Sequence, residues 1–229
     1  MSVPLRRSLG ILSTALITAG VVILLDVGLT LAWQEPLSTV YGSIQQGKAE
    51  DSLAKLEQRF PSAQDLESVA GEENLERRGE RLANRFSTEV ETGAGIGRIE
   101  IEGIGLDMVV VEGTDTASLR KGPGHYPETA FPGQGRTIGI AGHRTTYLAP
   151  FRQINEIDDG DAVVLEMPYG TFSYTVTGHE IVDPDQVEIV DDVGYEQLVL
   201  TACHPLYSAA QRWAVFAKLS EVRSVGEPR

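Results

Sequence analysis

The sequence has one cysteine, Cys203, among its 229 residues, so no disulfide can form within the chain. Positive charge is also scarce, since 19 Lys and Arg residues stand against 33 Asp and Glu residues, for a formal net charge of −14. Nucleic-acid binders need clustered positive charge, so this balance argues against nucleic acid as a partner. The acidic surface otherwise indicates solubility. The sequence shows no cluster of metal ligands, and we expect neither a metal nor a cofactor.

One long hydrophobic run lies near the N-terminus. Residues 9–33 form a predominantly apolar run with one charge, Asp26. At about 1.5 Å per residue in a helix, the run can span a hydrocarbon core of roughly 30 Å. Arg6 and Arg7 precede it, so the positive-inside rule predicts a cytoplasmic N-terminus and places the rest of the chain outside. The run exceeds the ~7–15-residue core of a cleaved signal peptide, so we favour an uncleaved anchor in the lipid bilayer. In an exported domain, the lone thiol of Cys203 marks a candidate reactive group.

The next segment, residues 34–93, carries dense charges of both signs. Apolar residues recur in it at helical spacing on either side of Pro61: Leu53, Leu56 and Phe60, then Leu75, Leu82 and Phe86. This pattern predicts a stalk of two amphipathic or solvated helices. A flexible spacer that lifts a domain off the membrane is the alternative.

From Gly93 onward, short β-like segments are separated by Gly and Pro turns. Strands are predicted at 96–102, 106–112, 137–141, 162–167, 171–182, 197–201 and 212–219, with a helical turn at 115–120 and a short helix at 148–157. About seven or eight short strands with one or two short helices predict a mainly β fold, a small closed β-barrel. The expected organisation is an N-terminus and anchor at 1–33, a stalk at 34–93, a catalytic domain at 94–221 and a tail at 222–229.

Cys203 stands at the end of the apolar strand segment 198–202, directly before a His-Pro dipeptide. A thiol at a strand end is held rigidly and can face a groove, which suits a nucleophile, although a lone cysteine is often a buried structural residue. A nucleophilic thiol needs a partner that handles protons. His143 ends another apolar strand segment, 140–142, so the two side chains can meet at one edge of a barrel.

Three other histidines compete with His143. His204 adjoins the cysteine, but adjacent strand residues point to opposite faces. His125 lies in a Gly-Pro turn as a plausible groove wall, and His179 sits in mid-strand as a surface residue. Arg212 begins the strand after Cys203, and the intervening hairpin can return its guanidinium beside the thiol to stabilise an oxyanion. A solvated or salt-bridged side chain is the ordinary alternative for a single arginine.

The order of His143, Cys203 and Arg212 resembles that of the sortases. Segment 140–143 is similar to their histidine strand, and segment 200–203 is similar to their T-L-x-T-C signature. Val199 and Ala202 stand where that signature has threonines, which affects the expected substrate contacts. The runs G-P-G-H-Y-P at 122–127, A-G-H-R-T-T-Y at 141–147 and C-H-P at 203–205 look most like the class E sortases of actinobacteria. The resemblance covers roughly residues 95–221.

The resemblance implies a transpeptidase on the extracellular face of a Gram-positive type of cell membrane. Cys203 would attack the Thr carbonyl of a C-terminal sorting signal, Leu-Pro-x-Thr-Gly or Leu-Ala-x-Thr-Gly, and form a thioester. His143 would act as acid and base, and Arg212 would hold the oxyanion and the substrate. The partners implied are exported proteins that carry such signals and a cell-wall precursor amine as acceptor. The substrate-binding residues expected are Tyr126, Thr145 and Thr201.

Four other functions are weighed against this one. Pilin-polymerising sortases carry a lid with an Asp-Pro-aromatic motif before the barrel, and residues 34–95 contain no Asp-Pro, so a housekeeping enzyme is favoured. L,D-transpeptidases have Ser-His-Gly before the cysteine, where this chain has Leu-Thr-Ala. Papain-like enzymes have the cysteine before the histidine. A sortase-fold surface protein that binds without catalysis would not need all three residues.

Overall fold

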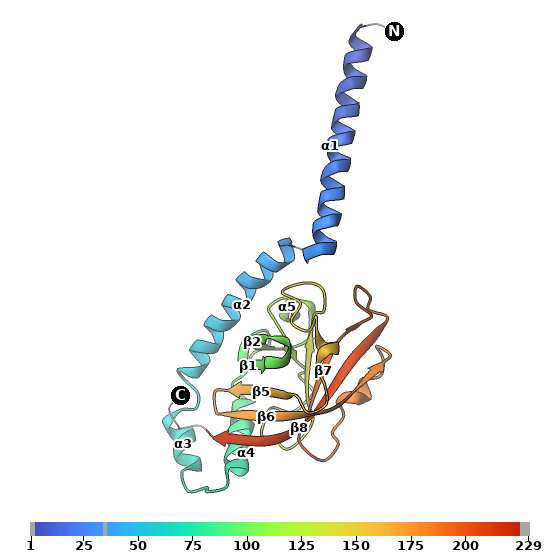
Figure 1. The fold of residues 1–229 in the computed structure, drawn as a ribbon. Coiled ribbons are helices and arrows are strands. Elements are labelled where there is room, and N and C mark those ends of the chain that lie inside the picture. The colour runs from blue at the N-terminus through green and yellow to red at the C-terminus, as the bar shows by residue number, and fades with distance from the viewer. Residues whose placement is uncertain (1–2, 34–35, 225–229) are drawn as a thin grey trace.

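The computed structural model describes residues 3–33 and 36–224, and shows a closed β-barrel from which one long helix projects (Figure 1). The helices are α1 (Val3–Trp33), α2 (Pro36–Glu57), α3 (Ala63–Val69), α4 (Leu75–Phe86) and α5 (Thr116–Leu119). The strands are β1 (Gly95–Ile101), β2 (Leu106–Glu112), β3 (Gly124–His125), β4 (Ile138–Gly142), β5 (Ala162–Met167), β6 (Gly170–Val182), β7 (Gln197–His204) and β8 (Gln211–Ser224). Short 3₁₀ turns are η1 (Glu102–Ile104), η2 (Ile154–Glu156) and η3 (Val187–Val190).

The strands close into a barrel in the order β1-β2-β3-β4-β7-β8-β6-β5. All neighbouring pairs are antiparallel except β2 with β3 and β4 with β7, which run parallel. Alternate residues of the strands fill the interior, among them Ile99, Ile140, Leu200 and Val215. The predicted mainly β barrel is confirmed. The sequence pattern missed β3, because this two-residue strand lies inside the Gly-Pro turn.

The short helix expected at 148–157 is wrong, since only the 3₁₀ turn η2 forms there. Residues 147–149 have positive φ values, between 43° and 68°, and this left-handed conformation cannot continue a right-handed helix. Instead, Phe151 donates its backbone N–H to the carbonyl of His143 at 3.0 Å and buries its ring completely. Tertiary packing at the end of β4 therefore overrides local helix propensity.

Helix α1 is apolar and stands apart from the rest of the protein (Figure 1). Its stretch Leu9–Gly28 has a mean hydropathy of 2.1, and none of it is buried inside the protein. Twenty residues at about 1.5 Å each match a hydrocarbon core of roughly 30 Å. By length and composition, α1 can cross a membrane, as expected for residues 9–33.

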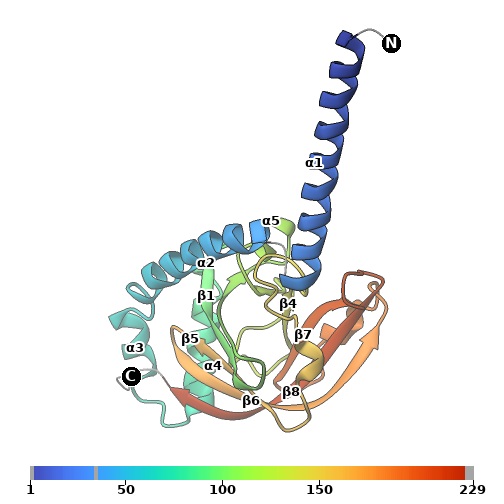
Figure 2. The same ribbon diagram turned by 45° about the horizontal axis from the view of Figure 1, so that its top comes forward.

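The segment expected to be a stalk packs against the barrel wall (Figure 2). Leu56, Phe60, Leu82 and Phe86 belong to the same hydrophobic core as the inner barrel residues. In a second cluster, Ala49 and Leu53 of α2 pack on Val109 and Val111 of β2. The predicted helices form, but they do not stand free, because burying their apolar stripes against the barrel is favourable. Residues of the expected stalk and residues of the barrel therefore share one packed core.

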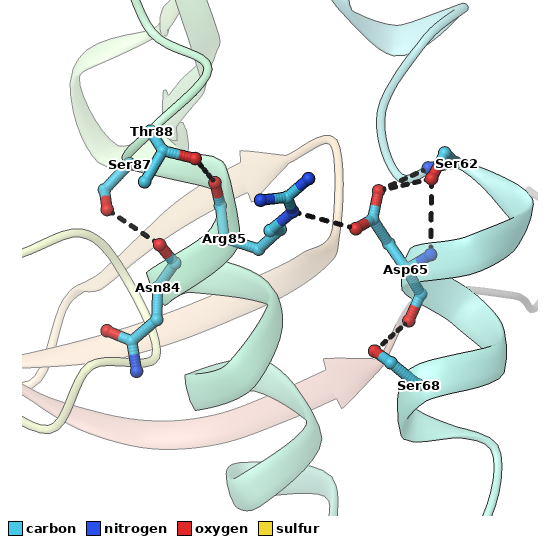
Figure 3. Close-up of polar contacts among 7 residues, drawn as sticks. All are labelled: Ser62, Asp65, Ser68, Asn84, Arg85, Ser87 and Thr88. Carbon is cyan, nitrogen blue, oxygen red and sulfur yellow. Dashed lines mark hydrogen bonds and ion pairs between the residues drawn. The ribbon is translucent and has the colours of Figure 1, made fainter.

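Hydrogen bonds lie at the ends of α3 and α4, and one of those drawn in Figure 3 joins the two helices. Ser62 caps α3 by accepting from the backbone N–H of Asp65, whose carboxylate accepts from Ser62 in return. The hydrogen bond from the Ser62 side chain is the main cause that lowers the pKa of Asp65. The same carboxylate accepts from Arg85 of α4 at 3.3 Å. Beyond Arg223, β8 ends at Ser224, and the rest of the expected tail lies outside the described residues.

Candidate active site

The strand register brings the three predicted catalytic positions to one edge of the barrel. Gly142 of β4 is partnered with Ala202 of β7 across a parallel pair, and the next residues are His143 and Cys203. Across the antiparallel pair of β7 and β8, Cys203 is partnered with Arg212. Three neighbouring strands thus place a histidine, a thiol and a guanidinium side by side. This juxtaposition can support acyl transfer through a thioester.

His143 has its Nε2 atom buried without a hydrogen-bond partner among the described residues. Burial is the main cause that lowers the pKa of His143, and the positive charge of Arg120 lowers it further. The neutral imidazole is therefore favoured to lower pH than for an ordinary histidine. The ring lies 5.2 Å from that of Tyr147, and the Arg120 guanidinium lies over the same tyrosine ring at 5.5 Å. A neutral ring with a free nitrogen can exchange a proton with a bound group.

Cys203 and Arg212 differ in how firmly their side chains are held. The thiol of Cys203 is half-buried. The guanidinium of Arg212 donates at 3.0 Å to the carbonyl of Ala209, in the loop between β7 and β8, and at 2.9 Å to the carbonyl of Gln211, the first residue of β8. Both bonds use Nη1, so the N–H groups on Nε and Nη2 can serve a substrate.

Two of the predicted substrate-binding residues contact each other. The hydroxyl of Tyr126 lies 2.9 Å from Oγ1 of Thr201. Thr201 is two residues before Cys203, so its side chain lies on the same face of β7 as the thiol. Gly139 makes room for the tyrosine ring, since a Cβ there would lie 2.6 Å from the ring carbon Cδ2. Thr145 is half-buried in the loop after β4.

His125 does not line a groove. It is buried, and its ring nitrogens lie 2.8 Å from a carboxylate oxygen of Glu112 and 2.9 Å from the carbonyl oxygen of Ala130. Its ring also stacks on Phe131 at 4.5 Å. These contacts fix the turn that carries Tyr126, because a buried polar ring must satisfy its nitrogens. The groove-wall interpretation failed because the Gly-Pro turn folds inward and pairs with β2 and β4.

The other histidines lie beside Trp213. His204 has Nδ1 3.1 Å from the guanidinium of Arg144, and its ring lies 5.4 Å from Trp213. His179 is exposed, as expected, and stacks on the same indole at 5.0 Å. Both rings therefore have contacts of their own, apart from those of His143.

Arg144 joins the two strand ends, a role that the sequence pattern does not predict. It is buried, and its guanidinium donates to the carbonyl oxygen of Cys203 at 3.4 Å and to the side chain of Asn155. Nε donates to the carbonyl of Arg152 at 3.4 Å, and the planar group lies over the ring of Trp213 at 5.9 Å. The arginine thus follows the histidine in sequence and ties its loop to the residue that bears the thiol.

Comparisons with known proteins agree with this fold and site. The family model of the sortase domain matches residues 99–220. Sortase D of Bacillus subtilis is 35% identical over 61% of this chain and 71% of its own length. Sortase SrtE1 of Streptomyces coelicolor is 30% identical over 60% of this chain and 44% of its own length. The solved structure of sortase E from Streptomyces avermitilis is 36% identical, covers 61% of this chain and 97% of that one, and superposes with a TM-score of 0.54.

The protein is a cysteine transpeptidase, since these matches agree with its closed barrel and with its cysteine at a strand end. The chain belongs to the sortase family. Its relatives include both a sortase D and a sortase E, so these matches establish the family and not the subclass.

Proposed function

We propose that this sortase is a class E type enzyme, anchored by α1, that attaches exported proteins to the cell wall. Its substrate is a C-terminal sorting signal of the Leu-Ala-x-Thr-Gly or Leu-Pro-x-Thr-Gly kind, and its acceptor is an amine of a cell-wall precursor. The barrel lies on the extracellular side of the membrane. The catalytic domain is residues 94–221, with α2–α4 packed on it.

In the first half-reaction, the sulfur of Cys203 attacks the Thr carbonyl carbon of the signal. Arg212 donates hydrogen bonds to the developing oxyanion. His143 passes the thiol proton to the departing glycine amine, the Thr–Gly bond breaks and a thioester remains. In the second, the acceptor amine attacks the thioester, and His143 takes a proton from it and returns that proton to the sulfur. The net result exchanges one amide bond for another, with no oxidant or cofactor.

The register around Cys203 is the observation that carries the proposal. Cys203 is directly partnered with Arg212 across β7 and β8. Gly142 and Ala202 are partnered across β4 and β7, and the next residue on each of these strands is His143 or Cys203. The pair of Tyr126 and Thr201, on the thiol face of β7, supports a role in signal recognition. The unpartnered Nε2 of His143 supports a role in proton transfer.

A peptide transfer assay tests the function. The full chain in detergent is incubated with a Leu-Ala-x-Thr-Gly peptide and a mixture of amines, namely triglycine, diaminopimelic acid and a lysine-containing pilin-like peptide, and products are identified by mass spectrometry. We expect cleavage between Thr and Gly and transfer to a wall-type amine. Transfer to the lysine peptide alone would indicate a pilin polymerase. Peptide binding without cleavage would indicate a binding protein and refute the proposal.

A further inference from the structure

The outer surface of α2 changes character along the helix. At about 100° per residue, Val40, Ile44 and Asp51 lie on one stripe opposite the face that packs on the barrel. Val40 is 62% exposed and Ile44 is 56% exposed. The packed face consists of Gly42, Gln46, Ala49, Leu53 and Leu56. Large apolar side chains at those exposures, in the first three turns of a helix packed on the barrel, indicate a covering partner.

Charge follows the same change. No charged residue occurs between Pro36 and Gly47, the first three turns of α2. Charges then come in quick succession, at Lys48, Glu50, Asp51, Lys55 and Glu57. The outer stripe is therefore apolar where α2 begins and charged beyond that. Such a gradient fits a helix that leaves an apolar interface and enters water.

The apolar turns lie at the foot of α1. Only residues 34 and 35 separate α1 from α2, and both views show the first turns of α2 beside the lower end of the long helix (Figures 1 and 2). Tyr41, which is 43% exposed, adds an aromatic ring of the kind that is enriched at membrane–water interfaces. The stripe is thus continuous with the helix that can span the bilayer, and the absence of charge favours lipid over a protein partner that needs polar recognition.

We propose that the first three turns of α2 lie on the outer surface of the lipid bilayer, with Val40 and Ile44 inserted at the boundary of headgroups and acyl chains. This inference rests on the proposed function in one respect, that α1 spans the membrane. The partner is the bilayer itself. Because α2 is packed on β1 and β2 along its other face, this contact fixes the height and tilt of the barrel.

The contact would hold the catalytic edge close to the lipid. Gly42 lies against the loop after β4, where a Cβ would be 3.0 Å from Cγ of Leu148 and 3.1 Å from the carbonyl carbon of Tyr147. The ring of Tyr147 lies 6.1 Å from that of Tyr41 and 5.2 Å from that of His143. Both views also place the loop between β7 and β8 at the end of the barrel nearer to α1 (Figures 1 and 2). An edge in this position suits substrates and acceptors that are themselves tethered to the membrane.

Depth-dependent quenching tests the inference. In a Cys203→Ala background, single cysteines replace Val21, Val40, Ile44 or Asp51 of the full chain, which is labelled with bimane and reconstituted in phosphatidylcholine–phosphatidylglycerol vesicles. Lipids with a nitroxide near the headgroup serve as quencher for positions 40, 44 and 51, and lipids with a nitroxide deep in the acyl chain serve for position 21. We expect the nitroxide lipid to quench bimane fluorescence at positions 40 and 44 at least about twofold more strongly than at position 51. Position 51 is the matched control, because it lies on the same stripe of α2.

The result at Val21, inside α1, separates the two claims. Quenching at Val21 with none at Val40 and Ile44 would overturn the surface contact and leave the anchor in place. Quenching at none of the positions would overturn both. Shielding of Ile44 from aqueous iodide without quenching by lipid would assign the stripe to a protein, and would also overturn the inference. Far-UV circular dichroism of each labelled variant checks that it has folded.

Discussion

At the scale of single residues, we propose that the hydroxyl of Tyr126 recognises the second position of the sorting signal. It pairs with Thr201, and either oxygen can be the donor. If Tyr126 donates, its oxygen can accept the backbone N–H that Ala has and Pro lacks. An unpaired polar group costs about 1–3 kcal/mol, so Ala should be preferred over Pro by roughly 5- to 150-fold. Tyr126→Phe should lower the ratio of kcat/KM for a Leu-Ala-x-Thr-Gly peptide to kcat/KM for a Leu-Pro-x-Thr-Gly peptide. Tyr195→Phe, at an exposed tyrosine, is the control, and an unchanged ratio in Tyr126→Phe would remove this residue from specificity.

The charge of Arg120 is predicted to tune His143. Burial and this guanidinium both lower the pKa of His143, so Arg120→Gln should raise that pKa while leaving the effect of burial. When the pKa of a histidine is lower in the folded state than in the unfolded state, the fold loses stability as the pH drops below the unfolded-state pKa. The free energy of unfolding of Arg120→Gln should therefore depend less on pH in that range. NMR titration of the imidazole in the Cys203→Ala protein measures the shift. Arg98→Gln, on the far strand β1, should leave it unchanged. A fall in the pKa of His143 in Arg120→Gln would contradict the assignment.

Arg144 is expected to be structurally irreplaceable by lysine. Its planar fork serves the carbonyl of Cys203 and the side chains of Asn155 and His204 together, which an ammonium cannot do. Arg144→Lys should lower the free energy of unfolding by about 1–3 kcal/mol for each buried group left unpaired. It should also change the alkylation rate of the thiol. Arg152→Lys, whose bond to Tyr207 is exposed, should change both little. Equal effects of the two substitutions would show that the fork is not required.

The juxtaposition of His143 and Cys203 at neighbouring strand ends could be predicted from sequence, whereas the contacts of Arg144 could not. His143 and Cys203 both end apolar segments, and strand ends meet at barrel edges, so pattern alone indicated a shared site. Arg144 acts mainly through backbone carbonyls and a ring from another strand, and such partners leave no trace in sequence spacing. His125 was misplaced for a related reason, because its partner Glu112 lies on a strand whose pairing with the turn cannot be read locally.

At the scale of elements, periodicity predicted strands well wherever they alternate or run apolar for five residues or more. β2 and β5 have the predicted bounds, Leu106–Glu112 and Ala162–Met167. The failures are elements shaped by contacts distant in sequence, namely the two-residue β3 and the left-handed loop at 147–149. For α2 and α4, the spacing predicted the helices, but only the three-dimensional structure shows that the barrel covers their apolar faces.

The packing of α4 on the barrel predicts a large stability effect. Phe86 is fully buried, with its ring 5.4 Å or less from those of Phe60, Phe131 and Tyr169. Phe86→Ala should lower the free energy of unfolding by about 3–5 kcal/mol. Leu75→Ala, on the same helix but 43% exposed, should change it by less than about 0.5 kcal/mol. Urea denaturation of both variants measures the difference. A small effect of Phe86→Ala would mean that the segment is a free stalk after all.

At the scale of the whole molecule, three features lie next to one another. They are the apolar helix α1, the outer face of α2 with its apolar first turns, and the barrel edge at the loop after β4. The long apolar helix α1 could be predicted from composition alone. The position of the edge could not, because it depends on how α2 packs against β1, β2 and the loop after β4. The proposed activity needs this arrangement, since the thiol must reach signals of exported proteins as they leave the membrane.

Trapping the acyl-enzyme tests the central claim most directly. The full chain is mixed with excess Leu-Ala-x-Thr-Gly peptide without an acceptor amine, quenched in acid and analysed by intact-mass and peptide mass spectrometry. We predict a mass increase equal to the peptide up to Thr, less one water, located on Cys203. Hydroxylamine should remove the adduct, and Cys203→Ala should show none. An adduct on another residue, or cleavage of the peptide by Cys203→Ala above the buffer rate, would contradict the account.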